Sequence, residues 1–117
     1  MKPMLIFVSG PYRADTQVGV AINIYDAGEI AKAIWQKGHY ALCPHMNSAY
    51  MDGIVPDEQF LAGDLVMLSK CDAVCLVDGW SKSVGAVAEV KLARRLGIHI
   101  YGSVDGILGV DDGDDKP

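Results

Sequence analysis

Apolar runs alternate with helical repeats of apolar positions along this chain. Residues 4–9 form a continuous apolar run that ends at Gly10 and Pro11, which is typical of a strand buried on both faces of a parallel sheet. Apolar side chains then recur at helical spacing over residues 18–36, and Gly38 follows the end of this repeat. We therefore expect a strand followed by a long helix.

The same alternation continues in the rest of the sequence. Pro44 ends the second apolar run, and Ser83 is a good N-cap for the last helical repeat. Residues 107–110 are a candidate fifth strand. The other expected elements are a strand over 39–43, a polar loop over 45–56, a helix over 56–70, a strand over 73–77, a loop over 78–83, a helix over 83–96 and a strand over 98–101.

Strands and helices joined by short connections predict an α/β fold with right-handed crossovers. We expect a flavodoxin-like (Rossmann-like) three-layer sandwich with a four- or five-stranded parallel sheet of order 2-1-3-4(-5). Residues 1–110 form one domain in this interpretation, and residues 111–117 form an acidic tail that is expected to be disordered. Ligands of such sheets bind beyond the carboxyl ends of the strands, here among the loops 9–13, 44–47 and 78–83.

Composition narrows the function classes. The 117 residues are 50% hydrophobic, and the tail contributes −3 of the net charge of −5. A body so close to neutral argues against binding long nucleic acid, but not against binding a single nucleotide. The first apolar run is too short to span a membrane, and an odd number of cysteines (three) fits a reducing compartment, so a cytoplasmic protein is expected. The cysteines are interpreted as small buried thiols, and no metal or organic cofactor is expected.

Two carboxylates interrupt apolar helical faces. Glu89 shares its face with small and apolar residues, while the cationic side chains of the same helix point away, and Asp64 occupies a similar position in the preceding helix. An unpaired buried carboxylate is costly, so either acid alone is as easily explained by a position at the edge of the face or by a hydrogen bond to backbone. Two in one small domain favour a functional site.

The loops at the same end of the predicted sheet contain groups that bind anions. Gly10 permits close backbone approach, and Arg13 offers a fork of donors. The start of the last helix is surrounded by Ser81, Ser83 and Gly85, which is a natural phosphate seat. Each has a simpler explanation, namely a solvated charge for Arg13 and helix capping for the serines. The phosphate-binding patterns GxxxxGK[ST] and GxGxxG are both absent.

Three further side chains are candidates for contacts with a substrate. His45 follows the second strand, although a loop histidine more often only faces solvent. Tyr12 and Trp80 are able to stack on a base, or to pack over their own loops with about equal weight. Ile22, Tyr25 and Trp35 extend the apolar surface of the first helix past one face, which predicts a homo-oligomer, most simply a dimer.

The sequence resembles the nucleoside 2-deoxyribosyltransferase-like superfamily over about residues 4–100. Its Gly-Trp-x-x-Ser-x-Gly-Ala form is most similar to a small, poorly characterised branch found in bacteria and phages. Its Ser-x-Gly-x-x-x-Glu pattern is also similar to the 2′-deoxynucleoside 5′-monophosphate N-hydrolases. The segments that carry the resemblance are Ser9-Gly10-Pro11-Tyr12-Arg13, Gly38-His39, Pro44-His45, Asp64-Leu65, Cys71-Asp72-Ala73-Val74 and residues 78–89, with Ala93 and Gly97.

The resemblance implies roles for several residues. Glu89 matches the family's nucleophile, and Asp64 matches the aspartate that assists proton transfer. Arg13 and Ser83 match residues that hold the 5′-phosphate. Transferases of free nucleosides tend to carry an aspartate at the position of Ser83, so the serine favours a phosphorylated substrate. The residues expected to bind substrate are Ser9, Gly10, Tyr12, Arg13, His45, Asp78, Trp80, Ser81, Ser83 and Gly85.

The chemistry of these residues fits cleavage of an N-glycosidic bond. A carboxylate such as Glu89 stabilises or captures an oxocarbenium-like sugar, and a second acid, Asp64, protonates the leaving base or activates water. Water as the acceptor gives hydrolysis, and a second base gives transfer. The substrate is therefore expected to be a (2′-deoxy)nucleoside or its 5′-monophosphate. The alternative is a module that binds a nucleotide or an ADP-ribose-like ligand without turnover, because fold alone does not separate the two.

Overall fold

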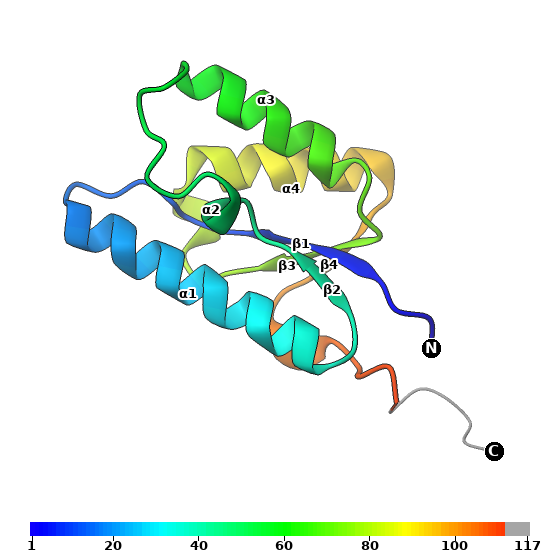
Figure 1. Cartoon of the computed structure of the whole chain (residues 1–117). Helices are drawn as coiled ribbons and strands as arrows, with labels where there is room; N and C mark the ends of the chain where they lie inside the picture. The colour runs from blue at the N-terminus through cyan, green and yellow to red at the C-terminus, as the bar shows by residue number, and fades with distance from the viewer. Residues whose placement is uncertain (112–117) are drawn as a thin grey trace.

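The computed structural model describes residues 1–111 as an α/β fold (Figure 1). The tail expected to be disordered, residues 111–117, lies outside the described part of the chain except for Asp111. The elements are β1 (Leu5–Ser9), α1 (Gln17–Gln36), β2 (Tyr40–Leu42), α2 (Pro44–Asn47), α3 (Asp57–Leu68), β3 (Ala73–Leu76), α4 (Val84–Leu96) and β4 (His99–Tyr101), with short 3₁₀ turns at Trp80–Lys82 (η1) and Val104–Gly106 (η2).

The four strands form one parallel sheet of order β2-β1-β3-β4, which confirms the predicted order 2-1-3-4. In the centre of the sheet, Ile6 of β1 lies in register with Ala41 on one side and with Ala73 on the other. Side chains of a strand alternate between the two faces of a sheet. Both faces of β1 and β3 are covered by helices, so these strands are continuous apolar runs in the sequence.

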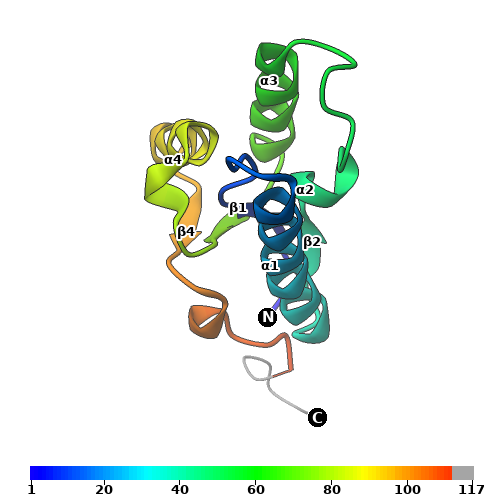
Figure 2. The same cartoon turned by 90° about the vertical axis from the view of Figure 1, so that its left-hand side faces the viewer.

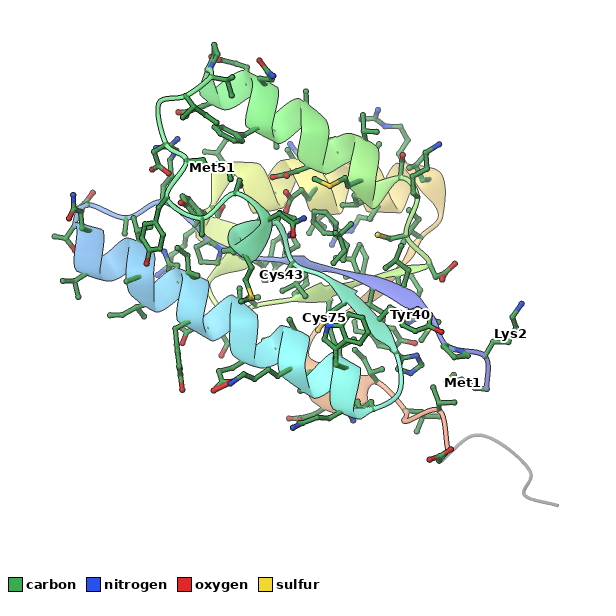
Figure 3. All side chains as sticks on the ribbon, viewed as in Figure 1. Met1, Lys2, Tyr40, Cys43, Met51 and Cys75 are labelled. Atoms are coloured by element: carbon green, nitrogen blue, oxygen red, sulfur yellow. The ribbon has the colours of Figure 1, made fainter. Side chains whose placement is uncertain are left out.

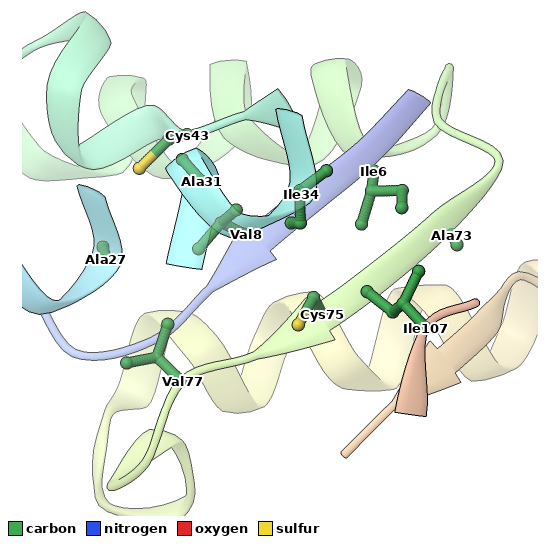
Figure 4. Close-up of a cluster of buried hydrophobic side chains, with 10 residues drawn as sticks. All are labelled: Ile6, Val8, Ala27, Ala31, Ile34, Cys43, Ala73, Cys75, Val77 and Ile107. Atoms are coloured by element: carbon green, nitrogen blue, oxygen red, sulfur yellow. The ribbon is translucent and has the colours of Figure 1, made fainter. Parts of the chain in front are cut away.

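Helices lie on both faces of the sheet (Figure 2), and they bury two separate cores. On the first face, α1 packs Ala27, Ala31 and Ile34 against alternate residues of β1 and β3 (Figure 4). Cys43 and Cys75 lie inside this core (Figures 3 and 4), which confirms the interpretation of buried thiols. On the second face, α3 and α4 cover the other side chains of the same strands. The molecule is thus the expected three-layer sandwich.

Of the two predicted sheet sizes the structure has the smaller, since the candidate fifth strand at residues 107–110 does not form. Within residues 107–110, the backbone groups bond to the end of α1 and to its neighbours rather than to β4. The amide of Val110 donates to the carbonyl oxygen of Lys37 (2.8 Å), and the ammonium of Lys37 donates to the carbonyl oxygen of Ile107 (2.7 Å). Ile107 is fully buried in the first core. The apolar pattern that suggested a strand therefore reflects burial of the segment without hydrogen bonds to a neighbouring strand.

The other difference concerns the predicted loop 45–56. Its first residues form the short helix α2, with Pro44 at the first helical position, where its missing N–H costs nothing. The proline that ends β2 therefore also begins a helical turn.

Among the described residues, no helix is long and apolar enough to cross a membrane.

Candidate functional site

A cleft of about 820 Å³ opens where the parallel strands end. Its wall is built from the residues after β1, β2 and β3, from one side of α3 and from the first turns of α4. This is the place at which parallel α/β sheets bind ligands. The predicted site residues found in its wall are Gly10, Tyr12, Arg13, His45, Asp64, Asp78, Ser83, Gly85 and Glu89.

Glu89 is the most buried carboxylate of the cleft, with 6% of its surface exposed. The hydroxyl of Ser9, at the end of β1, donates a 2.7 Å hydrogen bond to its Oε1 atom. Burial raises the pKa of Glu89 to about 7; the Ser9 hydrogen bond opposes the shift, and the negative charge of Asp64 adds to it. The side chain is therefore oriented by the sheet and poised to exchange a proton near neutral pH.

The local sequence explains why Glu89 faces inward. Ser83 caps α4 by accepting a hydrogen bond from the amide of Ala86 (3.2 Å), which fixes where the helix begins. Val90 and Ala93 are buried on the same side of α4 and bind the helix to the sheet. Glu89 lies in the second turn of α4, directly before these apolar anchors.

Asp64 lies on α3, half-buried in the wall of the same cleft. Burial raises its pKa to about 6. The two carboxylates come from adjacent helices, since α3 packs along α4, and the negative charge of Asp64 contributes to the raised pKa of Glu89. The apolar helical face that marked Asp64 in the sequence is the face turned to α4 and the cleft.

Gly10 and Tyr12 shape the loop after β1. A Cβ atom on Gly10 would meet the Cβ of Val77 at 2.5 Å, so the loop requires glycine where it passes the end of β3. The hydroxyl of Tyr12 donates to Asp52 (2.9 Å) and accepts from the amide of Tyr50 (3.2 Å). Tyr12 thus connects the β1–α1 loop to the segment between α2 and α3.

Arg13 forms an ion pair with Asp57, the first residue of α3. The two side chains are 61% and 63% exposed, so the pair lies at the mouth of the cleft. The guanidinium was predicted as a phosphate ligand, and the structure places it on the cleft wall with a carboxylate already bound.

His45 lies in α2 and is buried, with 6% of its surface exposed, rather than facing solvent from a loop. Its Nε2 atom lies 2.9 Å from the carbonyl oxygen of Pro11 and therefore carries the ring proton. Burial lowers the pKa of the imidazole, which keeps it neutral. Nδ1 is then an acceptor, and it is buried without a partner among the described residues. An unpaired buried acceptor in a cleft wall is typical of a group that awaits a ligand.

Three predicted residues are not part of the cleft wall. Ser9 is fully buried behind Glu89, to which it donates its hydrogen bond. Trp80 packs against the second core, and Ser81 lines a second, smaller depression beside η1. The serine and the tryptophan after β3 therefore shape the turn that leads into α4.

The wall also contains polar residues that sequence reasoning missed. The amide of Asn23 donates to the carbonyl oxygen of Tyr12 (3.1 Å), and Asp52 accepts from the hydroxyl of the same residue. Asp57 and Glu58 looked like ordinary acids in the first turn of a helix. They reach the site because the fold places them beside a loop that is more than forty residues away in the sequence. No local sequence pattern encodes this contact.

The parallel sheet of order 2-1-3-4, with a cleft at its carboxyl edge, defines an α/β protein of the doubly wound type. The model of the family described as "Domain of unknown function (DUF4406)" matches residues 6–102, and the chain belongs to this family.

Among solved structures, the fold is similar to the 2-deoxyribosyltransferase of Bacillus psychrosaccharolyticus, which is described as a biocatalyst for the synthesis of nucleosides. The TM-score is 0.58 at 17% identity, and the match covers 82% of this chain and 69% of the other. At this identity the likeness shows a shared fold, and it confirms the fold expected from the sequence resemblance. No curated protein sequence matches the chain.

Proposed function

We propose that this protein is an enzyme that cleaves the N-glycosidic bond of a nucleoside or nucleoside 5′-monophosphate, with Glu89 as the nucleophile. The observation that carries the proposal is a buried carboxylate, fixed by the hydroxyl of Ser9, in a cleft that a second carboxylate with a raised pKa also lines. Pairs of acids with shifted pKa values are typical of glycosidic bond cleavage.

Glu89 would act on the anomeric carbon of the sugar. As the bond to the base breaks, positive charge develops on the ring, and an ionised carboxylate against that carbon stabilises the charge or forms a bond to it. The Ser9 hydrogen bond holds the carboxylate in one orientation, which removes an entropic cost from the reaction. Because the pKa is about 7, a substantial fraction of Glu89 is ionised at neutral pH.

Asp64 would act as the general acid and then as the general base. The reactive form carries the proton on Asp64 and the charge on Glu89; because the pKa of Asp64 (about 6) lies below that of Glu89 (about 7), it is the less populated of the two singly protonated forms. In the first half of the reaction the proton of Asp64 moves to the leaving base. In the second half the carboxylate takes a proton from water, giving hydrolysis, or assists an incoming base, giving transfer.

The rest of the wall would bind the substrate. A volume of about 820 Å³ is within the range of small-molecule sites. The free Nδ1 of His45 accepts a hydrogen bond from a hydroxyl or amino group of the ligand. Gly85 offers close backbone approach, since a Cβ atom there would meet nothing within 4 Å, and Asp78 offers a further acceptor after β3.

The test is base release from a panel of ribo- and deoxynucleosides and their 5′-monophosphates, followed by chromatography. We expect the wild type to release base from at least one compound. We expect Glu89→Gln to lose several orders of magnitude in rate, about 10³-fold or more, while it still binds the compound, because the charge is needed only in the transition state.

Glu29→Gln is the matched control, since Glu29 lies on α1 outside the cleft wall, and it should react at the wild-type rate. Wild-type rates in Glu89→Gln would contradict the role of the nucleophile. Tight binding of a nucleotide without release of base from any compound would favour the alternative of a binding module.

A further inference from the structure

The charge of the cleft wall carries information about the ligand. Among the described residues, the wall contains two cationic side chains, Arg13 and Lys82, and His45 is kept neutral by burial. The described part of the wall also contains six carboxylates. They are Asp52, Asp57, Glu58, Asp64, Asp78 and Glu89.

One of the two cations of the wall, Arg13, already has an anionic partner. The guanidinium of Arg13 is bound to the carboxylate of Asp57, and both line the cleft mouth. An exposed ion pair of this kind is weak, so an incoming anion is able to displace Asp57 from Arg13. Displacement would nevertheless leave the carboxylates of Asp57 and Glu58 beside a phosphate that carries nearly two negative charges at neutral pH.

At the start of α4, the amide of Ala86 donates to the Oγ atom of Ser83 and is therefore not free for a phosphate, while the hydroxyl proton of Ser83 remains a donor. The wall is instead rich in acceptors, namely the carboxylates and the unpaired Nδ1 of His45. Acceptors match the hydroxyl and amino donors of an uncharged nucleoside, whereas a phosphate dianion has acceptors only.

We propose that the cleft takes a nucleoside without a 5′-phosphate, and that Asp57 is the specificity-determining residue that excludes the phosphorylated form. This inference rests on the proposed function and decides between its two substrates. It reverses the expectation that Ser83 marks a phosphorylated substrate, because the arginine that would share the phosphate is paired with Asp57 in a wall that is rich in carboxylates.

The experiment compares Asp57→Asn with Glu58→Gln. Both substitutions remove one negative charge from the first turn of α3 and from the cleft wall, but only the first frees Arg13. For each protein, kcat and KM are measured with a cleaved nucleoside and with its 5′-monophosphate. Thermal unfolding verifies that both variants are folded.

We expect the wild type to favour the nucleoside by about tenfold or more in kcat/KM, since an unpaired charge near a dianion costs about that factor in a partly hydrated site. Asp57→Asn should shift this ratio toward the monophosphate by about tenfold, mainly through KM, and Glu58→Gln by less than about threefold. Adding Arg13→Ala to Asp57→Asn should cancel the shift. A wild type that prefers the monophosphate, or equal shifts in the two single variants, would overturn the inference.

Binding measured by calorimetry on Glu89→Gln separates this inference from the proposed function. If the wild type cleaves no compound, but Glu89→Gln binds the nucleoside more tightly than its monophosphate, the proposed function fails and the proposed role of Asp57 stands. If the monophosphate is the better ligand and is cleaved, the function stands and the inference fails. Absence of both binding and cleavage contradicts both.

Discussion

At the scale of single residues, Glu89 places a negative charge at a buried position of the site, where a neutral side chain would make the fold more stable. Glu89 is ionised at high pH inside an environment that disfavours its charge, as its raised pKa shows. A sequence optimised only for stability would carry a neutral side chain there. Such residues are typical of functional sites, where some stability is given up for reactivity.

Glu89→Gln is therefore predicted to stabilise the fold increasingly with pH. The folded pKa of about 7 lies above the ordinary 4.5, so the folded state binds the proton more tightly. As pH rises between these values, the unfolded chain ionises first and the folded state loses stability, up to a constant cost above the folded pKa. The stability advantage of the variant should grow by about 2 kcal/mol between about pH 5.5 and pH 8, measured by denaturant unfolding.

Glu58→Gln controls for the loss of one charge and should show no such growth. A constant difference between wild type and Glu89→Gln at all pH values would mean that Glu89 titrates normally in the folded state.

Asp64→Asn is predicted to lower the pKa of Glu89. The negative charge of Asp64 contributes to the raised pKa, so its removal favours ionisation of Glu89 at lower pH. Carbon NMR of the glutamate side chain should show the titration midpoint moving down, with burial holding it above the ordinary value. An unchanged midpoint would show that the two acids do not sense each other.

His45 is predicted to bind substrate through Nδ1 and to anchor the loop through Nε2. The amide of Gln reaches the position of Nε2, so His45→Gln should keep the bond to Pro11 and the thermal stability but raise KM. The shorter His45→Asn replaces the acceptor near Nδ1 and loses the anchor, so it should lower the melting temperature instead. Equal KM values for His45→Gln and the wild type would remove His45 from the binding site.

At the scale of elements, most of the fold could be predicted because its signals are local. The buried runs of β1 and β3, the Thr16 cap of α1 and the Ser83 cap of α4 are each encoded within a few residues. The segment 107–110 was misjudged because its partners, Lys37 and His39, are far away in the sequence. In the site, the inward acids were visible from helical periodicity, whereas the pairings of Tyr12 and Arg13 were not.

His39 is predicted to hold three segments together at the end of the sheet opposite the cleft. Its buried ring accepts from the amide of Met4 (3.0 Å) and donates to the carbonyl oxygen of Leu108 (2.8 Å). His39→Leu leaves both backbone groups without a partner and should cost about 2–4 kcal/mol in the free energy of unfolding. KM should not change. The exposed His99→Leu serves as the control, and a similarly small effect of both would contradict this role.

At the scale of the whole molecule, α1 presents an apolar stripe to solvent. Val18, Ile22 and Tyr25 share its outer face and are 70%, 54% and 64% exposed. A contiguous exposed apolar stripe on a small protein favours self-association, and a helix face suits the two-fold symmetry of a dimer.

We therefore expect a homodimer that buries the outer face of α1. Light scattering at micromolar concentration should give the mass of two chains for the wild type and of one chain for the double variant Ile22→Lys, Tyr25→Lys. Val66→Lys, which places the same charge on an exposed position of α3, should leave the mass unchanged. A monomeric wild type would contradict the prediction.

The role of Glu89 as a nucleophile is tested most directly by the mass of the protein during turnover. The reaction with a cleaved nucleoside is stopped with acid within milliseconds, and the intact chain and its peptides are weighed. We predict a population heavier by one sugar residue, with the added mass on the peptide that contains Glu89, and no adduct in Glu89→Gln. Rapid base release without any adduct, or an adduct on another residue, would contradict the covalent role of Glu89.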